Sequence, residues 1–344
     1  MNNNQTTVLI CPLDWGLGHA SRIIPVVYLF KTSGYKVILG GSGKSGKLLK
    51  STFSDIPFIR ISSLAIHYPF RGRWFALNII LQLPVIIYNY VKEHYVLKSL
   101  VNAYNINFVI SDNRYGLYSN KTRNIIITHQ ISPVLPHLLL WLEYPLYLFV
   151  KALIHHFDEC WIPDLPGKNN LSGNLSHRYP IPRNAIFIGP LSRFMVFQGG
   201  DEGERFDLVI VLSGPQPELG RITQKIFQQA LNSEITALII CGFQDLNKFS
   251  ATRHGLKVVS HLEPFKFRTI LEKASAIICS AGFSGIMDLI TIGKSAILIP
   301  AKGQTEQEYL SQYLHKQGFF VRIPEPEFDL KNMSDYLNQL KSCK

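Results

Sequence analysis

The feature that most constrains the fold is a strand–glycine turn–helix pattern that opens each half of the chain. In the first half, the apolar run Val8 to Cys11 leads into the turn Trp15-Gly-Leu-Gly18, and a helical pattern follows from Ala20 to Lys31. In the second half, Asp207 to Leu212 leads into the turn Ser213 to Pro217 and another helical pattern. This unit is typical of α/β domains whose turns approach a phosphate.

Further apolar runs alternate with helical stretches in both halves. Alternating strands and helices predict a mostly parallel, doubly wound sheet. The predicted fold class is therefore α/β, with two Rossmann-like doubly wound domains facing each other across a cleft. The remaining predicted strands are 35–39, 58–61, 108–111, 125–128, 159–162 and 185–188 in the first half, and 236–241, 257–259, 276–279 and 295–299 in the second.

Length and two polar breaks set the predicted domain boundaries. A chain of 344 residues suits two domains of roughly 150–190 residues. Gly189-Pro190 ends the first series of strands, and the polar stretch Gln198 to Glu204 is typical of a linker. We predict an N-terminal domain over 1–197, a linker over 198–205 and a C-terminal domain over 206–344. The last helix is left open to packing back on the N-terminal domain.

The charge balance favours an anionic partner. A net charge of +11 and a pI near 9.3 fit a nucleotide, a nucleic acid or an acidic membrane. The basic residues are spread along the chain and do not cluster with stacking aromatic residues, so no nucleic-acid partner is expected. Five scattered cysteines without a CxxC pair predict reduced thiols and no zinc site. With a polar N-terminus that lacks a signal-peptide layout, we expect a cytoplasmic protein.

Two unusually apolar stretches, Trp74 to Val91 and Val134 to Ile154, are predicted to be helices of a soluble domain. Polar and charged residues interrupt both, and central charges are costly inside a bilayer. The basic and aromatic segment Arg71 to Trp74 adjoins the first stretch. Such a face suits an anionic membrane surface, so peripheral contact with the inner face of the plasma membrane is one prediction. The alternative is that both helices are core.

The first glycine turn offers a candidate general base. Gly16 and Gly18 allow close backbone approach to a ligand, but Ser21 stands where a dinucleotide fingerprint needs its third glycine, which disfavours NAD. His19 directly follows the turn, where an imidazole can act as a base. The alternative is a histidine that only makes local hydrogen bonds.

Asp112 is the second candidate base, because it follows a predicted strand at the end where α/β sites form. It could equally cap the next element. Arg22, Arg114 and Arg193 lie near predicted loop ends. Each is a candidate for stabilising an anionic leaving group, or else a surface or structural arginine.

The segment Gly40 to Lys47 looks like a phosphate-binding P-loop and fails the pattern in both registers. In one register Ile38 stands where glycine is required, and in the other Leu48 stands where a hydroxyl residue is required. A flexible basic loop is the preferred prediction, with a P-loop as the alternative.

The most informative stretch lies in the C-terminal half. A strand ending at Cys279 leads into a glycine turn whose backbone N–H groups can hold a diphosphate, and into a helix whose Asp288 carboxylate can accept from both ribose hydroxyls. The next strand ends at Pro300, and its loop offers polar groups to the hydroxyls of a sugar. The candidate donor-binding residues here are Ser280, Gly282, Phe283, Ser284, Gly285, Asp288, Gln304, Glu306, Gln307 and Glu308.

Three segments resemble glycosyltransferase family 28, which includes the peptidoglycan N-acetylglucosaminyltransferase and plant galactolipid synthases. They are Asp14 to Pro25, Ser280 to Asp288 and Pro300 to Glu308. The resemblance implies a GT-B fold, a UDP-sugar donor on the C-terminal domain, an acceptor on the N-terminal domain, inversion at the anomeric carbon, and no obligatory metal or other cofactor.

Carried over by position, the resemblance places Gly16 and Gly18 against the donor phosphates or the acceptor and makes His19 a candidate base. It puts Ser213 and Gly214 in the phosphate-side loop, Asp288 at the ribose-binding acid, and Glu306 to Glu308 in the sugar-binding loop. The chain departs from the family at Leu13-Asp14-Trp15, where glycines are common, and at Ala281 and Phe283.

The predicted function is transfer of a hexose or N-acetylhexosamine from a UDP-sugar to an acceptor, for which a lipid-linked molecule is one option. Two other functions stay open. A UDP-sugar epimerase of similar fold would work without an acceptor, and a non-catalytic nucleotide or nucleic-acid binder would account for the charge alone. Sugar, acceptor and the choice between His19 and Asp112 are left undetermined.

Overall fold

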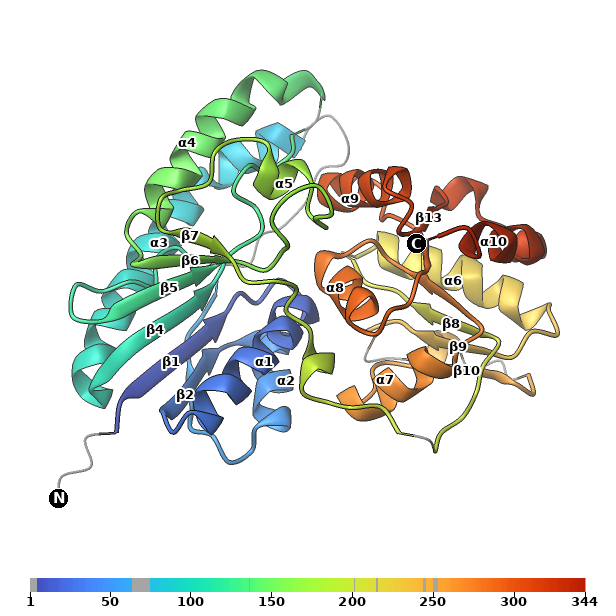
Figure 1. The fold of residues 1–344 in the computed structure, drawn as a ribbon, viewed down its shortest axis with the longest axis horizontal. Helices are drawn as coiled ribbons and strands as arrows, with labels where there is room; N and C mark the ends of the chain where they lie inside the picture. The colour runs from blue at the N-terminus through green and yellow to red at the C-terminus, as the bar shows by residue number, and fades with distance from the viewer. Residues whose placement is uncertain are drawn as a thin grey trace. The chain divides into compact units, whose positions relative to one another are not determined.

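The computed structural model describes residues 5–63, 75–135, 137–200, 202–214, 216–243, 246–249 and 253–343. The chain divides into two compact units, Met1–Ser192 and Arg193–Lys344, each built on its own parallel sheet (Figure 1). The sequence placed the end of the first domain at residue 197, whereas residues 193–197 belong to the second unit. Arg268 holds them there, since it donates to the carbonyl oxygens of Phe194 at 2.6 Å and Phe197 at 3.1 Å.

In the first unit, parallel strands follow the order β3-β2-β1-β4-β5-β6-β7. The order reverses between β1 and β4, and ligands of open α/β sheets bind outside the carboxyl ends of strands at such a point. The strands are β1 Thr7–Pro12, β2 Lys36–Gly41, β3 Phe58–Arg60, β4 Ile106–Asp112, β5 Arg123–Ile127, β6 Glu159–Ile162 and β7 Ala185–Phe187. The helices are α1 Leu17–Thr32, α2 Gly43–Thr52, α3 Phe75–Tyr104, η2 His137–Leu142, α4 Glu143–Ile154 and α5 Asn174–His177.

Helices cover both faces of this sheet. Leu9 of β1 packs in one cluster with Leu97 of α3, and Ile126 of β5 packs in another with Tyr147 of α4. Side chains alternate along a strand, so the buried Val8 points to the opposite face, and α1 packs against β1 and β2. The first sheet thus lies between helices on both of its faces (Figure 1).

A buried arginine joins α3 to the sheet. Arg114 is 1% exposed and donates through Nε to Glu93 of α3 at 2.8 Å and through Nη2 to the Ser62 carbonyl at 2.7 Å. Its Nη1 lies 2.9 Å from Sγ of Cys11 in β1. Burial raises the pKa of Glu93 and raises that of Cys11 to about 11. Arg114 is therefore structural, and a role on a leaving group is wrong because it is enclosed.

The prediction of a flexible basic loop over 40–47 is wrong. The strand β2 runs to Gly41 and α2 begins at Gly43. Asp14, from the turn after β1, accepts from the Ser45 N–H at 3.0 Å and from the Ser42 hydroxyl at 3.3 Å. A carboxylate in this place satisfies orphan donors of a helix N-terminus and complements its dipole.

The second unit repeats the topology, with parallel strands in the order β10-β9-β8-β11-β12-β13 and the reversal between β8 and β11. The strands are β8 Leu208–Val211, β9 Ala237–Ile240, β10 Leu256–Val259, β11 Ala276–Cys279, β12 Ile297–Leu298 and β13 Val321–Arg322. The helices are η3 Arg193–Met195, α6 Glu218–Leu231, η4 Asn247–Phe249, α7 Pro264–Lys273, α8 Phe283–Thr291, α9 Thr305–Lys316, η5 Glu325–Glu327, η6 Leu330–Asn332 and α10 Met333–Leu340. The predicted α/β class with two Rossmann-like units is confirmed.

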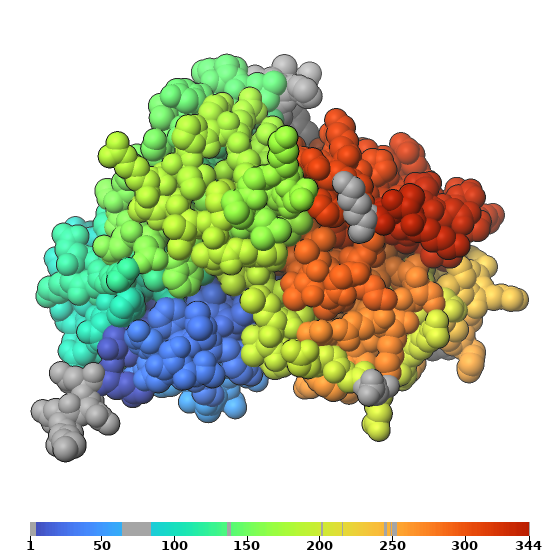
Figure 2. Space-filling model, in the orientation of Figure 1, coloured from blue at the N-terminus to red at the C-terminus, as the bar shows by residue number. Residues whose placement is uncertain are grey.

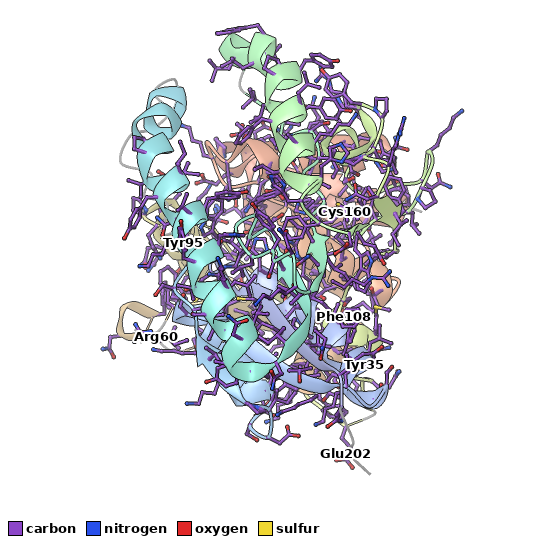
Figure 3. All side chains as sticks on the ribbon, turned by 90° about the vertical axis from the view of Figure 1, so that its left-hand side faces the viewer. Tyr35, Arg60, Tyr95, Phe108, Cys160 and Glu202 are labelled. Atoms are coloured by element: carbon purple, nitrogen blue, oxygen red, sulfur yellow. The ribbon has the colours of Figure 1, made fainter. Side chains whose placement is uncertain are left out.

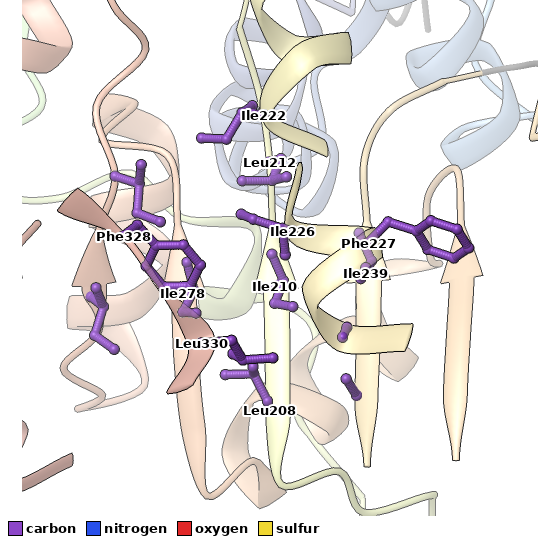
Figure 4. Close-up of a cluster of buried hydrophobic side chains, with 14 of the residues drawn as sticks. Leu208, Ile210, Leu212, Ile222, Ile226, Phe227, Ile239, Ile278, Phe328 and Leu330 are labelled. Atoms are coloured by element: carbon purple, nitrogen blue, oxygen red, sulfur yellow. The ribbon is translucent and has the colours of Figure 1, made fainter. Parts of the chain in front are cut away.

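The core of the second unit joins its first strand to its last helix. Ile210 and Ile278 are fully buried with Phe328 and Leu330 on one side of the sheet (Figure 4). In α10, Met333 and Tyr336 are buried in this same cluster, together with other residues of the second unit. The last helix therefore packs in the core of its own unit.

Both apolar stretches are helical, as predicted. The first lies in α3 from Phe75 onward, and the second in η2 and α4. Within the described ranges, no helix is long and apolar enough to cross a bilayer. Arg71 to Trp74 lie outside the described residues.

We predict that Arg114→Ala lowers the free energy of unfolding by about 3 kcal/mol, because it leaves the Glu93 carboxyl buried without its partner. The matched control is Arg123→Ala, whose side chain is 56% exposed and pairs with Glu159 at the surface, so its loss costs about 0–1 kcal/mol. Thermal unfolding checks both: the midpoint should fall by several degrees in Arg114→Ala and change little in the control. Equal midpoints would show that Arg114 is no anchor.

Candidate active site

Two side chains meet at the switch point of the first unit. His19 lies in the first turn of α1, directly after the glycine turn, and Asp112 is the last residue of β4. The His19 Nδ1 atom lies 3.2 Å from each carboxylate oxygen of Asp112. The Asp112 side chain is fully buried, whereas that of His19 is 16% exposed. The two candidates for the base are therefore bonded to one another.

A buried arginine completes the cluster. Arg22, one turn after His19, donates through Nε to Asp112 at 2.8 Å and through Nη2 to the other carboxylate oxygen. The same Nη2 lies 2.9 Å from His19 Nδ1, and Nη1 donates to His129 Nδ1 at 3.2 Å. Burial alone would raise the pKa of Asp112, but the neighbouring Arg22 and His19 hold it well below its usual range. Asp112 is thus a charged, enclosed group, and Arg22 is 2% exposed and engaged with it.

This arrangement separates the two ring nitrogens of His19. With its proton on Nδ1, the ring donates to Asp112, and Arg22 Nη2, which can only donate, bonds to Asp112 and not to the ring. The Nε2 lone pair then lies on the far side of the ring from Asp112, in the form that a general base needs. Among the described residues, none bonds to Nε2. The imidazole of His19 is partly exposed and is held by the buried Asp112 carboxylate. It can therefore remove a proton from a hydroxyl that reaches Nε2.

Gly16 and Gly18 lie in the turn before His19. Gly16 is exposed at φ +111°, a conformation that favours glycine, and open space surrounds the position of a Cβ. Gly18 is half-buried at the start of α1. The turn lies at the carboxyl end of β1, on the same edge of the sheet as Asp112.

In the second unit, the two predicted phosphate-side turns lie together at its switch point. The Ser213 N–H donates to the Ser280 hydroxyl at 2.9 Å, which joins the turn after β8 to the turn after β11. Gly214 follows Ser213, and a Cβ on Gly282 would lie 3.6 Å from the Ser213 hydroxyl oxygen. The sequence analysis assigned these residues, which come from separate segments of the chain, to one ligand. The structure brings the two segments within hydrogen-bonding distance of each other.

The helix α8 carries the remaining residues of the C-terminal motif. Ser284 and Gly285 are partly exposed in its first turn, with open space beside Gly285. Phe283 is 3% exposed, so its ring belongs to the core and only its backbone is available to a ligand.

Asp288 is nearly buried and has an arginine partner. Its carboxylate is 4% exposed, and Oδ2 accepts from Arg193 Nε at 3.0 Å and from Nη2 at 2.8 Å. The guanidinium also lies over the Phe267 ring, 4.7 Å from its centroid. Arg193, one of the proposed leaving-group cations, thus pairs with the predicted ribose-binding acid.

The polar loop after β12 is held by its own side chains. Gln307 Oε1 accepts from the Ala301 N–H at 3.0 Å, and Glu308 Oε1 accepts from the Gly303 N–H at 2.9 Å. Glu306 is partly exposed in the first turn of α9. The Gln304 side-chain oxygen is buried without a hydrogen-bond partner in the part of the chain that the structure describes. Gln307 and Glu308 therefore fix the conformation of the loop, and the side-chain oxygen of Gln304 is an acceptor that a ligand could use.

Three contacts of the candidate site were not predicted from the sequence. Arg22 stands three residues after His19, so helical spacing alone places both on one face of α1. His129 follows β5 at the carboxyl edge of the sheet, where strand-end rules could have suggested it. No sequence pattern joins Arg193 to Asp288, which are 95 positions apart.

Comparison with known families supports the C-terminal motif. Residues 209–343 match the glycosyltransferase family 28 C-terminal domain. A segment of 160 residues is 28% identical to the UDP-N-acetylglucosamine–N-acetylmuramyl-(pentapeptide) pyrophosphoryl-undecaprenol N-acetylglucosamine transferase of Bradyrhizobium diazoefficiens. The match covers 44% of this chain and 40% of that protein. The chain therefore resembles family 28 proteins, with the matched domain lying in its second unit.

Solved structures agree with the GT-B fold over nearly the whole chain. The glycosyltransferase of kitacinnamycin has a TM-score of 0.66 at 13% identity, covering 98% of this chain and 91% of its own. The calicheamicin glycosyltransferase has a TM-score of 0.62 at 11% identity, with 98% and 90% covered. MurG of Acinetobacter baumannii has a TM-score of 0.56 at 13% identity, with 98% and 92% covered. At these identities the likeness concerns the fold of this chain and not its substrates.

Proposed function

We propose that this protein is an inverting, metal-independent glycosyltransferase that moves a hexose or N-acetylhexosamine from a UDP-sugar to a hydroxyl of an acceptor. The observation that carries the proposal is the His19–Asp112 pair at the switch point of the first unit. Support for the donor comes from the family 28 domain of the second unit and from a relative whose name specifies UDP-N-acetylglucosamine.

In this mechanism His19 is the general base and Asp112 is its positioning residue. His19 Nε2 takes the proton of the acceptor hydroxyl, whose oxygen forms a bond to the anomeric carbon. The bond from that carbon to the diphosphate oxygen breaks, and its electron pair leaves with UDP. Attack opposite to the leaving group inverts the anomeric configuration. The charged Asp112 carboxylate, paired with Arg22, stabilises the imidazolium that forms.

The donor is assigned to the second unit. Backbone N–H groups of the Ser213-Gly214 turn and the N-terminus of α8 would stabilise the leaving diphosphate in place of a metal ion. Gly282, which has no side chain, directly precedes Phe283, the first residue of α8. Asp288 would hold the ribose hydroxyls, with Arg193 fixing its orientation. The buried acceptor of Gln304 suits a hydroxyl of the sugar.

UDP at about one hundred times its dissociation constant should stabilise the wild-type protein by roughly 2.7 kcal/mol, a shift of several degrees in thermal unfolding. We expect Asp288→Ala to lose this response relative to its own unliganded midpoint, and Asp335→Ala, an exposed acid on α10, to keep it. An unchanged response in Asp288→Ala would remove Asp288 from the donor site. No response of the wild type to any nucleotide would refute the transferase proposal.

His19→Ala should lower kcat by about 10²–10⁴-fold, the usual contribution of a positioned general base. The UDP-induced thermal shift should stay as in the wild type, because His19 is assigned to the acceptor. The measurement is UDP release from a UDP-sugar in the presence of an acceptor panel, with the exposed His254→Ala as the control. A variant as fast as the wild type would place the base elsewhere, and epimer formation without acceptor would favour an epimerase.

We also propose that the first unit contacts an anionic membrane and that the acceptor is lipid-linked, at the inner face of the plasma membrane. Large apolar side chains are exposed along α3, and Figure 3 shows Tyr95 on the outer side of that helix, 67% exposed. Others lie on η2 and α4, which form part of the molecular surface (Figure 2). Lys92 lies 5.9 Å from the Tyr88 ring centroid and adds a positive charge. We call this set the apolar face: Val85, Ile87, Tyr88, Val91, Tyr95, Leu140, Trp141, Tyr144, Leu148 and Phe149. A patch of this kind marks an interaction surface.

Flotation with phosphatidylcholine vesicles containing phosphatidylglycerol tests the membrane proposal. The wild type should float with the vesicles, less so at high salt, because attraction to anionic lipid is screened. A variant with Tyr88→Ser, Tyr95→Ser and Trp141→Ser should stay with the unbound protein. The control Ile186→Ser removes an apolar side chain, 49% exposed, from β7. Flotation of the triple variant at the wild-type level would exclude the apolar face as the contact.

A further inference from the structure

Three hydrogen bonds hold the turn that precedes His19 against β4 and α2. The Leu13 N–H donates to the Asp112 carbonyl at 3.0 Å, which joins the turn to β4. The Ser45 hydroxyl donates to the Gly16 carbonyl at 2.8 Å, and the Ser45 N–H donates to Asp14 at 3.0 Å. The turn is therefore held in a defined position relative to the His19–Asp112 pair.

The same contacts fill the nearest anion-binding position with a carboxylate of the chain itself. The N-terminus of α2, with its glycines and serines, would attract a phosphate. Asp14 occupies it so closely that a Cβ on Gly43 would lie 1.8 Å from the Asp14 Oδ2 atom. A phosphate group entering there would meet a negative charge already bonded to Ser42 and Ser45.

The same turn carries the indole side chain of Trp15. Trp15 is 45% exposed on the fixed segment, four residues before His19, and Leu17 beside it is 36% exposed. The exposed part of an indole offers an apolar surface, and the face of an aromatic ring has a negative quadrupole to which the C–H groups of a sugar ring are attracted. A hydroxyl that reaches His19 belongs to a molecule that passes this turn.

We propose that Trp15 is the platform on which a neutral pyranose ring of the acceptor stacks, and that Asp14 keeps phosphate groups out of the adjoining helix terminus. The proposal rests on the glycosyltransferase function and deepens it by naming the acceptor class next to the base. An acceptor whose diphosphate lies against this turn is disfavoured, so any phosphate of a lipid-linked acceptor lies beyond the stacked sugar.

The test uses the full chain saturated with UDP and two probes of equal tail length. The neutral probe is octyl β-D-glucopyranoside below its micelle concentration, and the anionic probe is octyl phosphate. Binding is measured by calorimetry and by intrinsic fluorescence. We expect the glucoside to bind more tightly than the phosphate and to change the emission of Trp15.

Trp15→Ala should weaken glucoside binding by about tenfold, and Trp15→Phe by less, because a smaller ring still stacks. The control Leu29→Ala, which removes a side chain 56% exposed on α1, should bind the glucoside as the wild type does. Thermal stabilisation by UDP should be the same in all four proteins, which shows that the variants fold and bind the donor.

Equal glucoside binding by wild type and Trp15→Ala overturns the proposal, as does a wild type that binds no glucoside or prefers octyl phosphate. Failure of the glycosyltransferase proposal would look different, because the wild type would then show no thermal stabilisation by UDP or UDP-sugars.

Discussion

The first unit depends on the buried ion pair between Arg22 and Asp112. Removing both charges from water costs several kcal/mol per ion, and the pair is tolerated because its geometry is bidentate and His19 and His129 take up further bonding positions. The pair locks α1 onto the end of β4 and thereby determines where the His19 ring lies. Replacing either partner would leave the other charge buried and uncompensated, so the position of the proposed base is linked to the stability of the unit.

The two units share a topology and use their helix termini in different ways. In the first, Asp14 fills the N-terminus of α2, whose sequence looks most like a phosphate loop. In the second, α8 begins at Phe283, directly after Gly282 and beside the joined Ser213 and Ser280 turns. A carboxylate of the chain excludes an anion from one place, and backbone donors favour it in the other. The proposed division, with an anionic donor on the second unit and a neutral ring beside His19, follows from this difference.

Local apolar runs predicted most of the sheets. The strands at 159–162 and 276–279 agree with the structure at both ends. The second is a short, fully buried run between Ser275 and Ser280, whereas burial alternates along the first. The strand β13 was missed, since two residues carry no usable period. The segment Gly40 to Lys47 was predicted as a loop from its composition, and its helix forms because Asp14, 31 positions before Ser45, supplies the cap.

The sequence by itself determined the alternation that makes two parallel sheets. It placed glycine turns, Asp112 and Gln304 after strands, and His19 and Asp288 on the helices that follow such turns. Turn chemistry and hydrophobic period act over a few residues, so the local sequence contains them. Only the tertiary structure decided what these groups are bonded to. His19 meets Asp112 across 93 positions, and Arg193 meets Asp288 across 95. Those pairings are set by how the packed sheet brings strand ends together, and the charge and exposure of each group depend on that packing.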